Sequence, residues 1–253
     1  MPPFTLTNKL LLITGSSSGI GRQCAITCSQ MGATVVLFGR DQDRLQETLS
    51  LMEGKGKHTI YAVDLHNYEK IEETVKDIVS QKGKIDGLIN CAGISTTLPL
   101  NSVSPQKMEQ FFQTNVIGAV NLTRLIVKPA HIRETGGSII FISSVMGVVG
   151  ENGKTLYSLT KGALIAAVKS MSVELAQRKI RVNAISPGVV ESPMSKSAIY
   201  SRSEESLNQI IKLHPLGLGQ PEDVANACVF LLSDASRWIT GTNVIVDGGY
   251  LAR

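Results

Sequence analysis

Long apolar runs are missing from this sequence of 253 residues. Runs such as residues 163–168 and 227–232 are far shorter than the roughly 20 residues that a membrane-spanning helix needs. We therefore expect no segment that crosses a membrane. Residues 1–9 contain no basic segment followed by an apolar stretch, so we predict no signal peptide and expect a cytoplasmic location.

Basic runs and metal-ligand spacings are also missing. The 25 Lys and Arg residues exceed the 21 Asp and Glu residues by four, and they are scattered along the chain. A nucleic-acid partner is therefore not expected. The four cysteines, Cys24, Cys28, Cys91 and Cys228, have no ligand-like spacing to the four histidines. We predict reduced, buried cysteines and no metal site.

The composition that is present, 43% hydrophobic and 18% charged residues, is typical of one globular domain over residues 1–253. Seven short apolar segments alternate with longer helix-like ones, and their uniform apolarity is typical of parallel strands covered on both faces. We predict an α/β fold, namely a Rossmann-like, doubly wound parallel sheet with helices on both faces. The predicted strands are residues 10–13, 34–38, 59–63, 87–90, 138–142, 181–185 and 243–246.

A glycine-rich turn, Thr14-Gly15-Ser16-Ser17-Ser18-Gly19-Ile20-Gly21, follows the first predicted strand. Glycines let the backbone turn sharply and approach a ligand, and free N–H groups at the start of a helix attract a pyrophosphate. A tight turn without a ligand is the alternative. The position between a strand and a helix favours a dinucleotide site. The predicted cofactor contacts in this turn are Gly15, Ser17, Ser18, Gly19, Ile20 and Gly21.

The end of the second predicted strand bears on the choice of dinucleotide. An acidic side chain there would bind the ribose hydroxyls, whereas Arg40 would attract the additional phosphate of NADP(H). Gly39 leaves the acidic position empty, and Asp41 suits a helix N-cap better than a ribose ligand. The sequence therefore favours NADP(H), with NAD(H) as the second choice.

Two further segments are interpreted from their positions. Asp64 ends the third predicted strand, where it either reaches the adenine or caps the helix that begins near Asn67. Asp64 and its neighbour Leu65 are predicted cofactor contacts. Residues 191–215 have weak periodicity and the composition of a loop, so we predict a mobile flap that covers the substrate.

Tyr157 and Lys161 lie four residues apart in a predicted helix, residues 156–178, and therefore share one face. Alone, such a pair is usually two solvated side chains, but this one follows a predicted strand and the glycine-rich residues 147–153. A nearby ammonium stabilises a phenolate and brings a tyrosine toward acid–base chemistry at neutral pH. Ser144 could then hydrogen-bond a substrate carbonyl oxygen while Tyr157 supplies the proton.

Together these motifs resemble the short-chain dehydrogenase/reductase family over essentially the whole chain. The resemblance is carried by the turn at 14–21, Asn90-Cys91-Ala92-Gly93, Asn115, Ser144, Tyr157 with Lys161, Pro187-Gly188 and Asp247-Gly248-Gly249. The chain departs from the family pattern at Cys91, where the second asparagine of Asn-Asn-Ala-Gly is usual, and at Ser192, where threonine is usual.

The resemblance implies a role for each matching residue. Tyr157 is the general acid–base, and Ser144 orients the carbonyl. Lys161 holds the nicotinamide ribose and tunes Tyr157, and Asn115 keeps a water for the proton relay. Taken alone, Asn115 could instead bind backbone inside a helix. The other cofactor contacts implied are Asn90, Ala92, Gly93, Ile185, Pro187, Gly188, Val190 and Ser192.

The resemblance also implies hydride transfer between NADP(H) and a carbonyl or secondary alcohol, in a homotetramer. The pattern is similar to 3-oxoacyl-acyl-carrier-protein reductases of fatty acid biosynthesis, so the acyl carrier protein is a candidate partner. One of their two carrier-docking arginines matches Arg178, and the other falls on Thr135, near His131 and Arg133. The alternatives are a dehydrogenase of a sugar, polyol, steroid or other small alcohol, and a catalytically silent nucleotide-binding sensor.

Overall fold

The computed structural model describes residues 3–54, 57–198 and 203–252. Its centre is a seven-stranded sheet in the order β3-β2-β1-β4-β5-β6-β7, and every neighbouring pair is parallel. The predicted doubly wound sheet is therefore confirmed. The strands are β1 (Leu10–Thr14), β2 (Thr34–Gly39), β3 (Thr59–Ala62), β4 (Gly87–Asn90), β5 (Gly137–Ile142), β6 (Ile180–Pro187) and β7 (Asn243–Val246).

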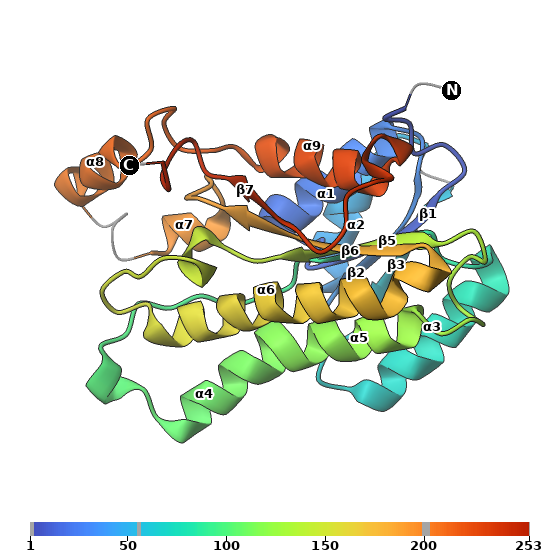
Figure 1. The fold of residues 1–253 in the computed structure, drawn as a ribbon, viewed down its shortest axis with the longest axis horizontal. Helices are drawn as coiled ribbons and strands as arrows, with labels where there is room; N and C mark the ends of the chain where they lie inside the picture. Colours follow the sequence, from blue (N-terminus) through green and yellow to red (C-terminus); the bar gives the residue numbers. More distant parts are fainter. Residues whose placement is uncertain (1–2, 55–56, 199–202, 253) are drawn as a thin grey trace.

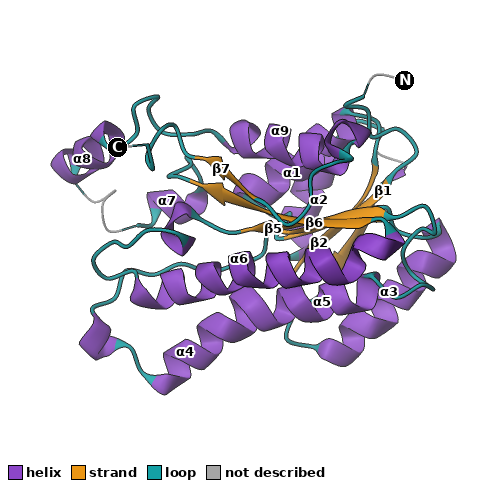
Figure 2. Ribbon diagram, in the orientation of Figure 1, coloured by secondary structure: helices purple, strands orange, loops and turns teal. Residues whose placement is uncertain are grey.

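Helices cover both faces of this sheet, as Figures 1 and 2 show. In the described ranges they are α1 (Gly19–Gln30), α2 (Gln42–Ser50), α3 (Tyr68–Lys82), α4 (Pro105–Phe112), α5 (Gly118–Ile126), α6 (Thr155–Leu175), α7 (Pro193–Lys196), α8 (Glu204–Lys212) and α9 (Pro221–Leu232). Helices α3, α5 and α6 pack on one face, and α1, α2 and α9 pack on the other.

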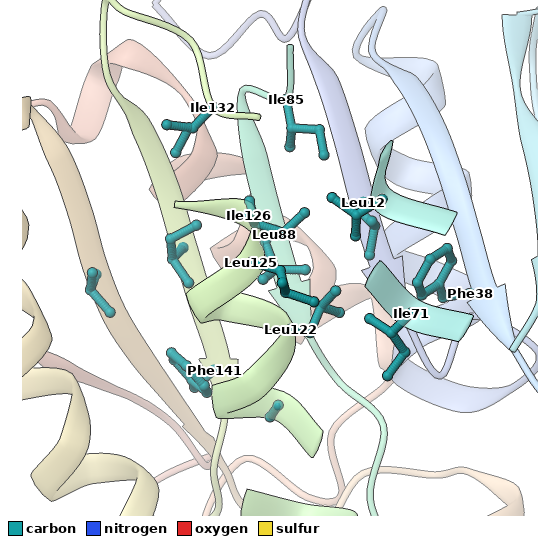
Figure 3. Packing of buried hydrophobic residues seen from close by; sticks show 14 of the residues in the cluster. Leu12, Phe38, Ile71, Ile85, Leu88, Leu122, Leu125, Ile126, Ile132 and Phe141 are labelled. Atoms are coloured by element: carbon teal, nitrogen blue, oxygen red, sulfur yellow. The ribbon is translucent and has the colours of Figure 1, made fainter. Parts of the chain in front are cut away.

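Two apolar cores, one on each face, explain why the strands are mainly apolar. Leu12 and Leu88 point toward Leu122 of α5 (Figure 3). Their neighbours Leu11 and Ile13 belong to the opposite core, with the residues of α1 and α9. Successive side chains of a strand point to opposite faces, so a strand covered on both sides needs no polar positions. Each such side chain contributes about 1.5–3 kcal/mol when fully buried.

The helix starts follow local capping rules, with one correction to the sequence interpretation. Asp41 caps α2 as predicted, since its carboxylate accepts a hydrogen bond from the backbone N–H three residues on. Asn67 caps α3 by accepting from the N–H of Lys70. Asp64 is therefore not the cap. Its Oδ1 accepts from the N–H of His66 at 3.0 Å.

The loop prediction for residues 191–215 is wrong where α7 and α8 lie. Ser192 caps α7 and Ser203 caps α8, each accepting a hydrogen bond from a backbone N–H in the first turn of its helix. Serines, which contribute to the loop-like composition of this range, are thus in part the caps of two short helices. Residues 199–202, between them, lie outside the described residues. Figure 1 shows α7 and α8 at one end of the molecule.

The winding of the chain reverses between β1 and β4. The chain runs outward from β1 to β2 and β3, then returns to place β4 on the other side of β1. A doubly wound sheet forms its ligand crevice at such a point, beyond the carboxyl ends of the strands. The glycine-rich turn after β1 and the segment after β4 are therefore neighbours at the crevice.

The described residues contain no helix that is both long and apolar enough to cross a membrane. Within the same ranges no three His, Cys, Asp or Glu side chains are grouped to hold a metal ion. All four cysteines are free thiols. Cys24 of α1 and Cys228 of α9 meet in the core with 3.7 Å between their Sγ atoms. Burial raises the pKa of Cys28, which keeps this thiol neutral.

Candidate active site

A cleft of about 400 Å³ opens at the carboxyl ends of the strands, a size usual for a small-molecule site. Its walls come from the turn after β1, the ends of β2, β4, β5 and β6, the start of α6, and residues of α7 and α8. Three predicted site residues, Asn90, Asn115 and Ile185, do not line it, and Ile185 is buried in the core on the α1 and α9 face. The predicted site residues that do are Gly15, Ser17, Ser18, Gly19, Ile20, Gly21, Arg40, Asp64, Leu65, Ala92, Gly93, Ser144, Tyr157, Lys161, Pro187, Gly188, Val190 and Ser192.

The glycine-rich turn needs glycine because the chain folds tightly against itself. Gly15 has φ +68°, and a Cβ there would lie 2.9 Å from the backbone of Ala92. A Cβ on Gly21 would lie 2.3 Å from the carbonyl oxygen of Gly15. The cap residue Ser18 makes no side-chain capping hydrogen bond to α1. The first N–H groups of a helix have no partner within it, so this turn can receive an anion.

Thr14 holds the two neighbouring strand ends together. Its Oγ1 accepts hydrogen bonds from the N–H groups of Cys91 (3.0 Å) and Ala92 (3.1 Å) and donates to the carbonyl oxygen of Ile89. Sequence reasoning did not give this residue a role. The signal was a hydroxyl at the end of an otherwise apolar strand, directly before the first glycine.

Two arginines lie at the end of the cleft formed by β2. Arg40 follows β2, and Arg44 lies in the first turn of α2. Both side chains are exposed. The sequence interpretation had identified Arg40 but not Arg44, because a helix-forming arginine near an N-cap reads as an ordinary surface residue. Asp64 lines the same end, so two guanidinium groups face one carboxylate and the local charge is positive.

The side chains of Tyr157 and Lys161 meet one turn apart on α6. Nζ of Lys161 lies 5.7 Å from the centre of the Tyr157 ring and donates a 2.7 Å hydrogen bond to the carbonyl oxygen of Ile142. Lys161 is only 4% exposed. Burial lowers its pKa to about 8, whereas Cys91 acts in the opposite direction. A buried cation is thus held beside the phenol, between β5 and α6.

The adjacent serines after β5 have different contacts. Ser143 donates from Oγ to the carbonyl oxygen of Lys161 at 2.8 Å, and its N–H donates to Ile185. Ser144 accepts a 3.2 Å hydrogen bond from the N–H of Met146, at the start of the 3₁₀ turn Val145–Gly147. Its hydroxyl can still donate. Ser143 therefore joins β5, β6 and α6, and Ser144 can serve a ligand.

Asn115 lies behind the cleft wall. It belongs to a π-helical turn, Gln113–Ile117, between α4 and α5 and is 1% exposed. Its Oδ1 accepts from the N–H of Ile94 (2.8 Å), and Nδ2 donates to the carbonyl oxygen of Ile94 and to Oγ1 of Thr160 (both 3.0 Å). π-Turns inside helices are frequent at functional sites. Asn115 thus binds the backbone after β4, the alternative considered from the sequence, and ties it to α6.

Asn90 also lies away from the cleft. It is 3% exposed, and its Nδ2 donates to Oγ1 of Thr123 in α5 at 3.0 Å. Its Oδ1 has no hydrogen-bond partner among the described residues. The side chain of Asn90 therefore braces β4 against α5, and the neighbouring Ala92 and Gly93 form the wall.

His214 couples the loop after β6 to α8, a role that the sequence interpretation missed. Val189 donates its N–H to Nε2 of His214 at 3.1 Å, so Nδ1 carries the proton and donates to the carbonyl oxygen of Ile210 at 2.8 Å. On the other side of this loop, a Cβ on Gly19 would lie 3.4 Å from Cβ of Ser192. The loop after β6 therefore spans from the glycine-rich turn to α8.

The predicted carrier-docking residues lie outside the cleft. Arg178 follows α6 at the end opposite Tyr157, and the 21 intervening steps of about 1.5 Å separate the two by about 30 Å. Arg133 pairs with Asp86 at 2.8 Å. His131 is buried and binds the carbonyl oxygen of Leu125. The sequence match at Arg178 therefore puts no basic side chain at the cleft of its own chain.

Comparison with known proteins identifies the family. A family model described as enoyl-(acyl carrier protein) reductase matches residues 15–251. The chain belongs to the short-chain dehydrogenase/reductase family. Membership confirms the predicted class, an oxidoreductase that acts on carbonyl and alcohol groups. One family member, the 3-oxoacyl-[acyl-carrier-protein] reductase FabG of Thermotoga maritima, is 37% identical over 246 residues, 96% of this chain and 98% of the relative.

Solved structures of the family include close matches to the fold. The gluconate 5-dehydrogenase of Burkholderia cenocepacia, in complex with NADP and tartrate, has a TM-score of 0.91 and 26% identity, over 99% of this chain and 98% of its own. A 7α-hydroxysteroid dehydrogenase, complexed with NADH and 7-oxo glycochenodeoxycholic acid, has a TM-score of 0.91 and 29% identity, over 98% and 96%. Family members of this shape thus act on different alcohols.

Proposed function

We propose that this chain interconverts a carbonyl group and a secondary alcohol with NADP(H). The observation that carries the proposal is the contact between Tyr157 and Lys161 in the same cleft as the glycine-rich turn and Ser144. A catalytically silent nucleotide sensor would need the turn but not these three side chains. The membership of the family supports the same reaction class.

The cleft residues fit a dinucleotide with a phosphate on its adenosine ribose. The turn from Gly15 to Gly21 offers N–H groups to the pyrophosphate, and Arg40 and Arg44 offer charged donors to the additional phosphate. Asp64 and Leu65, which line the same cleft, would contact the adenine. The gluconate dehydrogenase was solved with NADP and the steroid dehydrogenase with NADH, so NAD(H) is the second choice. When bound, the cofactor supplies the hydride.

Residues after β4 and β6 would hold the nicotinamide half of the cofactor. Lys161 would hold its ribose, and the amine of Lys161 already lies beside Tyr157. The remaining walls of this half are small or apolar and let the ring approach closely. The residues that we propose for these contacts are Ala92, Gly93, Pro187, Gly188, Val190 and Ser192, with Asn90 supporting the segment from behind.

The proposed chemistry is proton transfer at the carbonyl oxygen. In reduction, the hydroxyl of Tyr157 gives its proton to this oxygen, and Ser144 donates a hydrogen bond to it. The Lys161 ammonium stabilises the phenolate that results. Asn115 holds the backbone of Ile94 against α6 and, as the family resemblance implies, keeps a water for returning the proton to Tyr157.

Two substrate classes are open for this reaction. The Thermotoga relative supports a 3-oxoacyl thioester on the acyl carrier protein. The solved structures support other alcohols. The compounds named with them, gluconate, tartrate and 7-oxo glycochenodeoxycholic acid, each carry a carboxylic acid group.

We propose that α7 and α8 of residues 191–215 form the flap over the substrate, since Met194 and Ile210 line the cleft.

A homotetramer in the cytoplasm is proposed as the working form. Large apolar side chains are exposed on α6, where Val173 is 79% exposed and Leu159 is 49% exposed. Trp238, before the last strand, is 93% exposed. We propose that α6 and the region of the last strand form the two subunit interfaces of the homotetramer that the family resemblance implies.

The experiment that tests the reaction is Tyr157→Phe, assayed by NADPH absorbance with panels of 3-oxoacyl thioesters, ketones and alcohols. General acid–base catalysis is worth about 10²–10⁴-fold, so turnover falls by at least about 100-fold while NADPH affinity changes little. Tyr68→Phe, an exposed tyrosine bonded to Gln113, is the matched control and keeps full activity. More than about a tenth of wild-type turnover in Tyr157→Phe would overturn the assignment.

A further inference from the structure

A buried lysine lies in the cleft beside the proposed catalytic residues and has no role in the proposed chemistry. Lys154 immediately precedes α6, lines the cleft three residues before Tyr157 and is only 8% exposed. Lysine is almost never buried to this degree unless it is paired. The partner must therefore come from the surrounding protein or from a ligand.

The protein supplies little to the amine of Lys154. Nζ donates one long hydrogen bond, 3.4 Å, to the carbonyl oxygen of Thr96. No acidic side chain in the described ranges lies within the 4.0 Å of an ion pair. An ammonium has three donors, and the described residues accept a hydrogen bond from only one of them. Burial lowers the pKa of Lys154, whereas Glu151 raises it, and a bound anion would offset the same burial cost.

The other charged side chains that line the cleft lie at its β2 end, bind the backbone or are exposed to solvent. Arg40 and Arg44 lie at the end formed by β2, and Lys161 donates to Ile142. Glu151 lines the cleft near Lys154, but it is exposed at the rim. Among the described cleft residues, Lys154 is therefore the cation that can serve the substrate.

We propose that Lys154 binds a carboxylate of the substrate and that the chain acts on small oxo or hydroxy acids. The inference rests on the proposed function and chooses between its two substrate classes. Lys154 and Tyr157 line the same cleft, and Lys154 directly precedes the first turn of α6, to which Tyr157 belongs. A carboxylate on Lys154 and the carbonyl that Tyr157 protonates therefore belong to one small substrate. The acyl portion of a 3-oxoacyl thioester carries no charge that could pair with Lys154.

The test measures charge selectivity with inert probes on the NADPH-saturated protein. Saturation occupies the phosphate sites at Arg40 and Arg44, so that a probe anion cannot bind there. Tartrate and threitol have the same four-carbon chain. Its two ends are carboxylates in tartrate and primary alcohols in threitol. Calorimetry and thermal shift report their affinities for the wild type, Lys154→Met, Lys154→Arg and the control Lys76→Met, which changes an exposed lysine of α3.

The wild type is expected to bind tartrate at least about 10-fold more tightly than threitol, as a charge-assisted hydrogen bond requires. Lys154→Met abolishes this difference, Lys154→Arg keeps most of it, and Lys76→Met leaves it unchanged. A role of Lys154 in holding Thr96 alone would weaken both probes equally. Equal affinity for the two probes in the wild type, or retained selectivity in Lys154→Met, would overturn the proposal.

A second experiment measures turnover of matched substrate pairs. The pairs are 3-oxobutanoate and its methyl ester in reduction, and gluconate and glucitol in oxidation. Lys154→Met is expected to lose about 10- to 100-fold in kcat/KM for the acids and about 3-fold or less for the neutral members. Glu151→Gln, which removes the opposing charge, raises kcat/KM for the acids. A preference for the neutral members overturns the inference. A complete lack of turnover counts against the proposed function, and the probe affinities still decide the inference.

Discussion

Replacing Lys161 by methionine tests the central electrostatic contact of the site. The change removes the buried ammonium and keeps a side chain of similar length. Nζ lies 5.7 Å from the centre of the Tyr157 ring. At an effective dielectric constant of about 20, two unit charges at this separation interact by about 3 kcal/mol. Loss of that stabilisation from a phenolate-like transition state lowers kcat/KM by about 100-fold.

The same substitution alters how stability depends on pH. Burial lowers the pKa of Lys161 from 10.5 to about 8, so between these values the unfolded chain binds more protons than the folded one. Stability therefore rises with pH in this window. The buried charge costs about 3 kcal/mol at pH 7, and about 1 kcal/mol of this cost is recovered by pH 9. Methionine does not titrate, so the unfolding free energy of Lys161→Met lacks this pH dependence.

Urea unfolding of the wild type and the variant at pH 7 and pH 9, with initial rates of NADPH oxidation, provides the assay. The unfolding free energy of the wild type is expected to gain about 1 kcal/mol relative to Lys161→Met over this range. Lys76→Met, on the exposed face of α3, follows the wild type in both measurements. The reasoning is refuted if both proteins respond equally to pH, or if the variant keeps more than about a tenth of the rate.

Two further changes test the cofactor end of the cleft. Arg40→Ala is expected to weaken NADPH binding by about 10- to 100-fold through loss of a charge-assisted hydrogen bond, and fluorescence titration should find NADH almost unaffected. Equal losses for both nucleotides would contradict the phosphate assignment. Gly15→Ala places a Cβ 2.9 Å from the backbone of Ala92, so both the melting temperature and NADPH affinity should fall. Gly54→Ala, with φ +63° and its nearest contact at 4.0 Å, controls for backbone strain alone.

Local patterns in the sequence were sufficient for the fold and for the glycine-rich and catalytic parts of the cleft wall. The strands were predictable because burial on both faces favours apolar residues on both sides of a strand, as Leu11 and Leu12 illustrate. The turn from Gly15 to Gly21 was predictable because its glycines are required by contacts within a few residues or with the neighbouring strand. The loop assignment within residues 191–215 was wrong where α7 and α8 lie, because serine is common both in loops and at helix caps.

The sequence by itself determined where the apolar strand segments and the glycine-rich turn occur along the chain. It also determined the spacing that puts Tyr157 and Lys161 on one helix face. Each of these features depends on neighbours along the chain. Only the tertiary structure decided that Asn90 and Asn115 stand behind the cleft wall and that Lys154 is buried in it. Those outcomes depend on which distant segments pack together. A lysine three residues from a tyrosine has the same local pattern whether it is solvated or enclosed.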